Sequence, residues 1–401
     1  MAELKYWLWL ATRRRMGVQG MRTVLERFGT PERAYFADPA EYRFLPPIMA
    51  AALRDRSIEA GDRIRGDCER LGIRIMTIQD ADYPERLRQL PDAPYLLYLK
   101  GRVPDIDELV TIGVVGARRA SQYGRTVAGR MGLELARGGA TVVSGIAVGI
   151  DGCAVHGVLQ AGGAPVCVVA GGIDVPYPKE HRGLYEDVAA SGLLISEYPP
   201  GTPNKAEHFP VRNRIISGLS LGVVVVEARE HGSGAMITAD LALEQNRDVF
   251  AVPGNVDAEG SRGCIRLIQQ GAKPVLNAED ILVEYRDRYP VKLVKVPALD
   301  EREVAQRLRV SPEAEHEQMT VDKTDGLEYS LNERSTQGLT DDQIAILHAL
   351  MESPGQADDL VERTQIPARR VLSALTMLQL AEWIEEKPGK RFACLTKPIS
   401  K

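Results

Sequence analysis

The feature that most constrains the fold of this chain is a regular alternation, after Val110, of short apolar runs with amphipathic segments of helical length. The first run begins at Val110, and the others cover 140–144, 164–170, 193–197, 222–227 and 248–252. These runs are apolar throughout rather than at every second residue, which is typical of strands buried on both faces of a parallel sheet. We therefore predict an α/β fold built on a doubly wound parallel sheet.

The first apolar run ends abruptly in Gly116, Ala117, Arg118 and Arg119. A short β-branched run closed by glycine predicts a central strand that leads through a tight loop into a helix. Ligands of such sheets bind outside the carboxyl ends of the strands. The tip of this strand is therefore expected to deliver positive charge to a ligand.

The other loops expected at the same edge of the sheet are rich in glycine and in cations. They are predicted over 118–123, 144–151, 171–179, 198–214, 229–238 and 253–263. Free amides beside helix N-termini favour an anion, and arginine binds phosphate through two parallel hydrogen bonds. One glycine in such a loop often supplies only a positive φ, but turn geometry does not require a cation beside each glycine. The loops together indicate an extended polyanion or a nucleotide as the ligand.

Several enzyme classes lack their sequence signatures here. The spacing Gly113-Val114-Val115-Gly116 is wrong for a dinucleotide-binding fingerprint, and no Walker phosphate loop occurs. No nucleophile and base share a recognisable local motif. Asp151 is interpreted as a loop-bracing or helix-capping carboxylate, and His156 as a satisfied, semi-buried histidine. Tyr177 and Phe209 either stack on bases or pack against the loops.

The two ends of the chain predict separate modules. Residues 1–71 are expected to be helical, and Gly17-Val18-Gln19-Gly20 opens a helix in a form that fits either a DNA-backbone contact or a packing domain. Residues 291–338 are charged and aperiodic, which predicts a flexible linker. Residues 339–401 predict three helices and a hairpin, with a capping box at Thr340, the outline of a winged helix.

The net charge, the apolar runs and the cysteines limit which ligands and which cellular location we expect for this protein. The net charge of −5 argues weakly against general nucleic-acid affinity but does not exclude a local basic crevice. No apolar run reaches membrane-spanning length and the start is not a convincing signal peptide, so we expect a cytoplasmic protein. The five cysteines are scattered, which predicts reduced thiols and no metal site.

The motif series resembles the DNA-processing protein A family (DprA, also called Smf). The order of motifs matches over roughly Gly72 to Asp280, and Phe209-Pro210-Val211-Arg212-Asn213-Arg214 is the most specific string. The strings that carry the resemblance are Val115-Gly116-Ala117-Arg118, 144–151, Tyr177-Pro178, Ser196-Glu197, 209–216, 233–238 and Val252-Pro253-Gly254.

The resemblance implies an extended Rossmann-like domain over 72–290, with a small helical domain over 1–71 that is SAM-like or helix-hairpin-helix-like, and a winged helix at the C-terminus. It also implies a homodimer without cofactor or enzymatic activity. Such a protein binds single-stranded DNA, protects incoming strands and helps to load the RecA recombinase during natural transformation.

Roles carried over by position follow from the resemblance. Arg118 would hold a DNA phosphate at the strand tip, Lys179 would add a second phosphate contact, and Arg212, Asn213 and Arg214 would line the same pocket. The DNA-binding set is expected to comprise Gly116, Ala117, Arg118, Ser144, Gly145, Gly171, Gly172, Tyr177, Lys179, Phe209, Arg212, Asn213, Arg214, Ser233, Gly234 and Thr238.

Two departures from the family pattern and two alternatives stand beside this interpretation. Ala117 replaces a more usual serine, and His181 stands where an asparagine is usual. The alternative function is a nucleotide-processing enzyme of the phosphoribohydrolase type, whose Pro-Gly-Gly-x-Gly-Thr string is absent. In the winged helix, cations lie among many acids, so it is either a protein-contact module or an auxiliary duplex-binding module; those cations are Arg369, Arg370, Lys387, Lys390 and Arg391.

Overall fold

The structure is a computed structural model that describes residues 3–295, 334–335, 340–380, 383–387, 391–394 and 398–399. The described residues fall into two compact units, one within Met1–Ser311 and the other within Pro312–Lys401. Most of the predicted linker over 291–338 lies outside the described residues. Its first part belongs to the first unit, because Leu293 is buried and the amide of Val294 donates to the carbonyl of Gly138.

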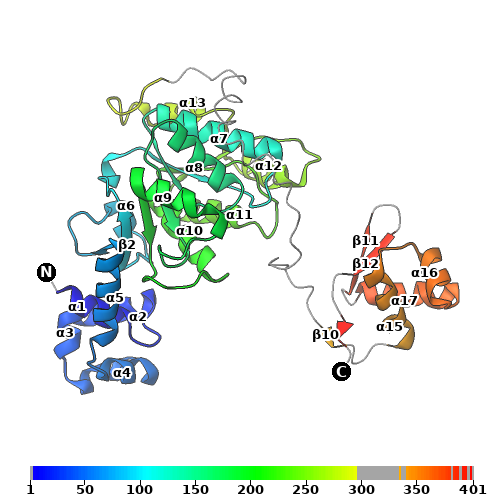
Figure 1. The fold of residues 1–401 in the computed structure, drawn as a ribbon, viewed down its shortest axis with the longest axis horizontal. Coiled ribbons are helices and arrows are strands. Elements are labelled where there is room, and N and C mark those ends of the chain that lie inside the picture. Colours follow the sequence, from blue (N-terminus) through cyan, green and yellow to red (C-terminus); the bar gives the residue numbers. More distant parts are fainter. Residues whose placement is uncertain are drawn as a thin grey trace. The chain divides into compact units, whose positions relative to one another are not determined.

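The first unit begins with a helical region, as predicted (blue in Figure 1). Its core is aromatic, with Trp7 and Trp9 fully buried, and Trp7 stacks on Tyr95 beside the sheet. The hydroxyl of Thr30 caps its third helix by accepting from the amide of Arg33. The elements are α1 (Leu4–Ala11), α2 (Val18–Phe28), α3 (Pro31–Phe36), η1 (Pro39–Phe44), α4 (Pro47–Arg54) and α5 (Glu59–Leu71).

A single sheet follows, in which the described residues form nine strands in the order β1-β2-β6-β5-β4-β3-β7-β8-β9. Strands β3 to β9 pair in parallel, whereas β2 pairs antiparallel with both β1 and β6. The strands are β1 (Arg74–Thr77), β2 (Leu96–Gly101), β3 (Thr111–Val115), β4 (Thr141–Ser144), β5 (Val166–Val169), β6 (Leu193–Ser196), β7 (Gly222–Val225), β8 (Asp248–Ala251) and β9 (Lys273–Pro274).

Helices cover both faces of this sheet (Figure 1). Successive residues of β7 point to opposite sides: Val223 and Val225 join one core with α10 and α11, while Val224 joins another with α7 and α8. This explains the uniformly apolar strands and confirms the doubly wound architecture. The helices are α6 (Glu85–Arg88), η2 (Ile106–Glu108), α7 (Gln122–Arg137), α8 (Ile150–Gln160), η3 (Lys179–His181), α9 (Arg182–Ser191), α10 (His208–Leu219), α11 (Gly234–Glu244), η4 (Glu259–Ser261), α12 (Arg262–Gln269) and α13 (Glu279–Arg286).

Two predicted loops are wrong in their extent. The loop expected over 229–238 ends at Ser233, because α11 begins at Gly234. The loop expected over 198–214 ends at Glu207, because α10 begins at His208 and includes the string Phe209–Arg214. Pro210 lies in the first turn of α10, where proline costs no helical hydrogen bond, so it marks the start of a helix rather than a loop. The basic string therefore has helical phase.

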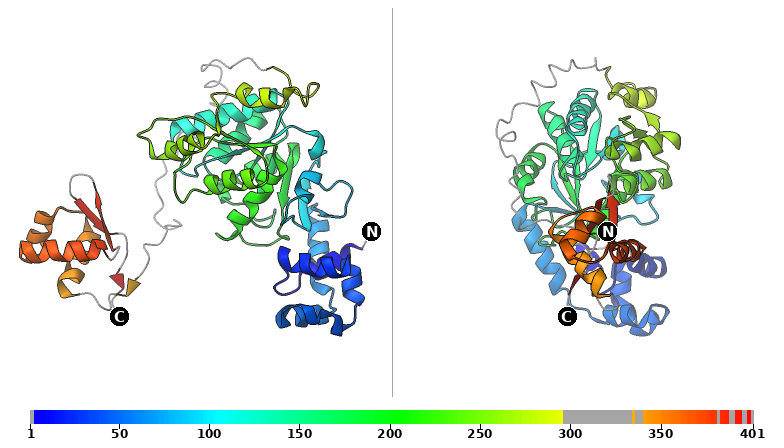
Figure 2. Two further views of the ribbon diagram at one scale, coloured as in Figure 1. Left: turned by 180° about the vertical axis from the view of Figure 1, so that it is seen from behind. Right: turned by 90° about the vertical axis from the view of Figure 1, so that its right-hand side faces the viewer.

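The second unit is the predicted winged helix (orange to red in Figure 2). Thr340 and Gln343 form the predicted capping box, and Trp383 is buried among the helices. Its elements are α15 (Asp341–Glu352), α16 (Ala357–Thr364), α17 (Ala368–Leu380) and a hairpin of β11 (Ile384–Lys387) and β12 (Arg391–Cys394), with the short pair β10 (Arg334–Ser335) and β13 (Pro398–Ile399).

Candidate nucleic-acid interface

The topology brings the predicted loops to one edge of the sheet. Strand β3 lies between β4 and β7, so the chain reverses its direction of travel across the sheet at β3. The crevice outside the carboxyl ends of the strands at such a reversal is where doubly wound sheets bind ligands. The loops that follow β3, β4, β5 and β7, which carry most of the predicted site residues, all end at this crevice.

Arg118 is the exposed cation at the tip of β3. Its guanidinium carbon lies 4.4 Å from the centroid of the Phe209 ring, and no ion-pair partner for it occurs among residues 3–295. Tyr177 packs on the same ring, edge to face, with centroids 5.5 Å apart. The aromatic pair therefore supports a planar cation whose hydrogen-bond donors remain available to a ligand.

The tip of β3 is held against the start of α8 by close backbone contacts. The amide of Ile150 donates to the carbonyl of Ala117, and the amide of Ala117 donates to the carbonyl of Glu227. Gly149 has φ of 86°, and a Cβ on it would lie 2.3 Å from the carbonyl oxygen of Ala117. A Cβ on Gly116 would meet the side chain of Ile150 at 2.4 Å. These two glycines permit the close approach of the β3 tip to α8, which orients Arg118. Backbone hydrogen bonds of Ala117 hold the tip, so this contact does not need the hydroxyl of the serine that is more usual at position 117.

A buried charge cluster lies beneath the exposed cation. The Arg212 guanidinium donates to the carbonyls of Gly145 (2.9 Å) and Val168, and its Nε donates to the Asn213 side chain. Asp151 accepts from the amide of Gly145 at 3.1 Å, which confirms its interpretation as a loop-bracing carboxylate. Burial raises the pKa of Asp151 and lowers that of Arg212, while the opposite charge of each partner acts against both shifts. Arg212 thus holds the loops in place beside the Phe209 ring.

The start of α11 contributes backbone donors. Its N-cap residue, Ser233, makes no side-chain capping bond, and the amides of Gly234 and Ala235 have no partner among the described residues. The carbonyl of Gly234 accepts from the side chains of Asn213 and Thr238, which ties this turn to α10. Free amides at a helix N-terminus make an anion-binding surface.

Other predicted residues form the frame rather than the binding surface. The Ser144 hydroxyl donates to the carbonyl of Val114, and the Gly171 carbonyl accepts from Ser196. The amide of Gly172 donates to the carbonyl of Thr202.

Lys179 differs from these framework residues. It is exposed at the start of η3, so its ammonium group is accessible to a ligand.

Three histidine and tyrosine side chains that brace the crevice were not assigned this role from the sequence. His181 places Nδ1 3.0 Å from the carbonyl of Ile146, so it secures the β4–α8 loop. His208 stacks on Tyr198, with ring centroids 4.1 Å apart, and its Nδ1 lies 2.9 Å from the carbonyl of Ala170. These roles are hard to predict from sequence, because the carbonyls that the two histidines contact, those of Ile146 and Ala170, lie more than 30 positions away along the chain. His156, expected to be semi-buried, is exposed on α8.

Arg214 lies apart from Arg212. Its Nη2 donates to both oxygens of Glu197 at 2.7 and 2.8 Å, and its Nε lies 3.1 Å from Asp92. Burial raises the pKa of Glu197, and the Arg214 charge opposes that rise. The structure therefore does not bring Arg214 together with Arg118 and Phe209.

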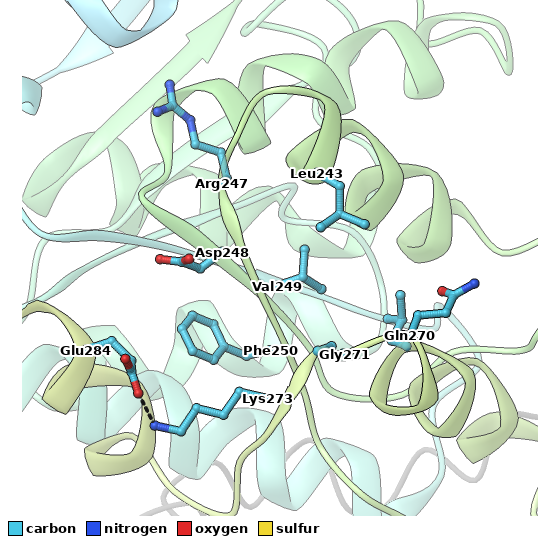
Figure 3. A pocket seen from close by; sticks show the side chains of 11 residues that line it. Leu243, Arg247, Asp248, Val249, Phe250, Gln270, Gly271, Lys273 and Glu284 are labelled. Atoms are coloured by element: carbon cyan, nitrogen blue, oxygen red, sulfur yellow. Dashed lines mark hydrogen bonds and ion pairs between the residues drawn. The ribbon is translucent and has the colours of Figure 1, made fainter.

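A pocket of about 340 Å³ lies elsewhere on the first unit, at the amino end of β8 (Figure 3). Its cation Lys273 is paired with Glu284, and Arg247 points away from that pair. Two carboxylates, Asp248 and Glu284, are among its lining residues. This pocket shares no residue with the crevice and offers little to an anion.

The winged helix uses several of its cations internally. Arg370 pairs with Asp342 through two contacts of 2.7 and 2.5 Å, and Arg391 donates to the carbonyl of Pro354. Lys390 and the side chains of Arg369 and Lys387 lie outside the described residues. The Arg370 charge is therefore already neutralised at the start of α17.

Other kinds of site are absent from the described part of the chain. No group of three metal-ligating side chains occurs there, and no described helix is long and apolar enough to cross a membrane. All five cysteines are free thiols; Cys68, Cys167 and Cys264 are buried and the other two are half-buried.

Comparison with known proteins gives consistent results. The chain matches DNA recombination-mediator protein A over residues 74–286 and the DprA winged helix domain over residues 332–390. It is 34% identical to a Smf protein of Synechocystis over 79% of each chain, and 44% identical to the DNA processing protein DprA of Bacillus subtilis over 60% of this chain and 82% of that one. The X-ray structure of DprA from Streptococcus pneumoniae aligns with a TM-score of 0.62 and 34% identity, covering 71% of this chain and 99% of that one.

Proposed function

Because the chain belongs to the DNA recombination-mediator protein A family, we propose that it binds single-stranded DNA in the crevice at the carboxyl ends of β3, β4, β5 and β7. The observation that carries the proposal is the exposed Arg118 guanidinium, supported by Phe209 above the buried Arg212. A sequence-tolerant strand binder needs phosphate-binding cations and aromatic side chains, and both meet here.

The wider role is also a proposal. In the cytoplasm, a homodimer of this chain would protect incoming single strands and help to load the RecA recombinase during natural transformation. The family supports this role, and the crevice supplies donors for the backbone of a strand without selecting a base. The winged helix would serve as a protein-contact or duplex-binding module, and the neutralised Arg370 favours protein contact.

A non-enzymatic role fits the acids of the crevice. Asp151 accepts from the amide of Gly145, and Glu227 accepts from the amide of Ser121. A general base needs a carboxylate that can reach the substrate, and these two are buried and engaged in loop contacts. The competing proposal, nucleotide hydrolysis, is tested by incubating the protein with nucleoside monophosphates and measuring released base.

Direct binding measurements test the main proposal. Fluorescence anisotropy with labelled single-stranded and duplex oligonucleotides should give tighter binding to the single strand, with affinity that falls as salt rises. Absence of single-strand binding at low salt would refute it. Mass measurement with and without the oligonucleotide tests the dimer, and the same titrations on a chain ending at Gln337 report what the winged helix adds.

A further inference from the structure

Tyr123 is an exposed aromatic side chain at the edge of the sheet that carries the crevice. Its side chain is 54% exposed, and no other tyrosine or phenylalanine among residues 72–295 is exposed. It lies in the first turn of α7, five positions after Arg118, and it belongs to none of the apolar cores of the first unit. Single exposed apolar side chains are common on protein surfaces, so the exposure alone does not indicate a function.

The Tyr123 ring is also held in one orientation. Its hydroxyl donates to the carbonyl of Pro253 at 3.0 Å. Tyr123 follows β3 and Pro253 follows β8, and β7 lies between these two strands in the sheet. The side chain therefore extends across the carboxyl end of β7, along the crevice edge. A ring that is anchored at both ends loses little conformational entropy when a ligand stacks on it.

The turn that carries Tyr123 also carries Arg118, and one buried residue closes it. Glu227 is 8% exposed, and its backbone carbonyl accepts from the amide of Ala117 at 2.7 Å. Its carboxylate accepts from the amide of Ser121 at 2.8 Å. Both ends of the turn are thus fixed to Glu227, so Arg118 and Tyr123 keep a constant separation.

The aromatic side chains beside Arg118 are already engaged with other groups. The Phe209 ring carries the Arg118 guanidinium at 4.4 Å, has the Arg212 guanidinium at 5.9 Å, and meets the edge of Tyr177. A ring face covered by a guanidinium cannot stack on a base at the same time. A single-strand site combines cations for the phosphates with ring faces for the bases. Tyr123 supplies the exposed ring that Phe209 does not offer.

The charges around Tyr123 suit a strand that passes over the ring. Arg119 and Arg125 are exposed on either side of it in the sequence, and neither has an ion-pair partner among residues 3–295. The acids of the facing loop after β8 are Asp257 and Glu259, and Glu259 is already paired with a cation of the loop after β7. Two unpaired cations are therefore available for the phosphates that flank a stacked base.

We infer that Tyr123 is a base-stacking residue of the single-strand site, and that its ring receives a base of the strand whose phosphate Arg118 binds. The strand then runs along the sheet edge from the aromatic pair beside β5 to the loop after β8. Stacking uses the face that every base has, so this contact adds affinity without selecting a sequence. The inference rests on the proposed function and extends it by naming a base contact and a direction for the strand.

The test uses the full chain and two labelled single strands of equal length, one of thymidine nucleotides and one of abasic nucleotides, which have the same phosphates without bases. Tyr123→Ala removes the ring, and Tyr123→Phe keeps the ring but loses the bond to Pro253. Phe36→Ala, the matched control, removes an exposed aromatic side chain of the N-terminal region. Binding is measured by anisotropy over a range of salt concentrations, and circular dichroism checks folding.

The wild type should bind the thymidine strand more tightly than the abasic strand. Tyr123→Ala should weaken binding of the thymidine strand by about 5-fold to about 140-fold, the effect of losing one stacked base. Its salt slope should not change, because no charge is removed. Tyr123→Phe and Phe36→Ala should bind the thymidine strand like the wild type, and all four proteins should bind the abasic strand alike.

Three results would overturn the inference. Equal losses in Tyr123→Ala and Tyr123→Phe would mean that the hydroxyl contact acts by holding the loop, equal losses on both strands would mean that no base is involved, and the third result is the absence of any loss. The proposed function survives each of them as long as the wild type binds a single strand with an affinity that Arg118→Gln reduces. Failure of the wild type to bind either strand would refute the proposed function and this inference with it.

Discussion

Replacing Arg118 with glutamine tests the crevice at the point where the structure exposes its charge. The side chain is exposed and contacts the Phe209 ring at 4.4 Å, so its loss removes one cation–π contact and one predicted phosphate partner. Cation–π contacts at exposed sites contribute about 0.5–1 kcal/mol, which corresponds to a fall in melting temperature of only a few degrees. The fold should therefore remain intact.

The effect on binding should be larger than the effect on stability. A charge-assisted hydrogen bond contributes about 1.5–3 kcal/mol when shielded and an exposed ion pair about 0.2–1 kcal/mol. The contribution of Arg118 should lie between these limits, because its side chain is exposed but packs on the Phe209 ring. We expect a loss of about 1–2 kcal/mol, a factor of about 5–30 in affinity, with a salt slope shallower by about 0.7.

The assay is anisotropy of a labelled single strand across a salt series, with two matched variants. Arg118→Lys keeps the charge and should keep the slope while losing part of the affinity, because an ammonium cannot bind phosphate through two parallel N–H groups. Arg70→Gln removes another exposed cation, on α5, that pairs with Asp67, and should change neither quantity. If Arg118→Gln and Arg70→Gln gave the same affinity and slope, the reasoning would be refuted.

Three further predictions follow from the packing of the first unit. Gly149→Ala should lower the stability of the fold by at least about 1–3 kcal/mol and weaken DNA binding, because the new Cβ would collide with the carbonyls of Ala117 and Arg118; denaturant titration and anisotropy measure both effects. Arg214→Met should destabilise the fold by about 3–5 kcal/mol, because it leaves Glu197 buried without its partner. The loss of stability, measured by denaturant titration, should be smaller at pH 5 than at pH 8, because a carboxyl group with a raised pKa is more readily protonated at the lower pH. An equal loss at both pH values would contradict this prediction. Cys68, whose thiol has a pKa raised by burial to about 11, should resist alkylation at pH 8 until the protein is unfolded, and rapid labelling of the native protein, located by mass spectrometry, would show that the site opens.

Local sequence patterns were sufficient to predict those structural features that depend on residues close together in the chain. The apolar strands, the Thr340 capping box and the turn at Gly116 were predicted correctly because strand burial, capping and tight turns are set by a few neighbouring residues. Asp151 was also interpreted correctly as a bracing residue, since its partner Gly145 lies six positions away.

The sequence by itself determined a doubly wound sheet with glycine-rich and basic loops at one edge. Tertiary structure decided which of those cations reach solvent. Arg212 and Arg214 are two positions apart in one motif, but a helix turns by about 100° per residue, so they enter different surroundings once α10 begins at His208. Arg212 supports the crevice, and Arg214 joins Glu197, Asp92 and the start of α2. Only the packing of distant segments could make that division, because the carbonyls that accept from Arg212 and the carboxylates that bind Arg214 belong to other elements of the fold.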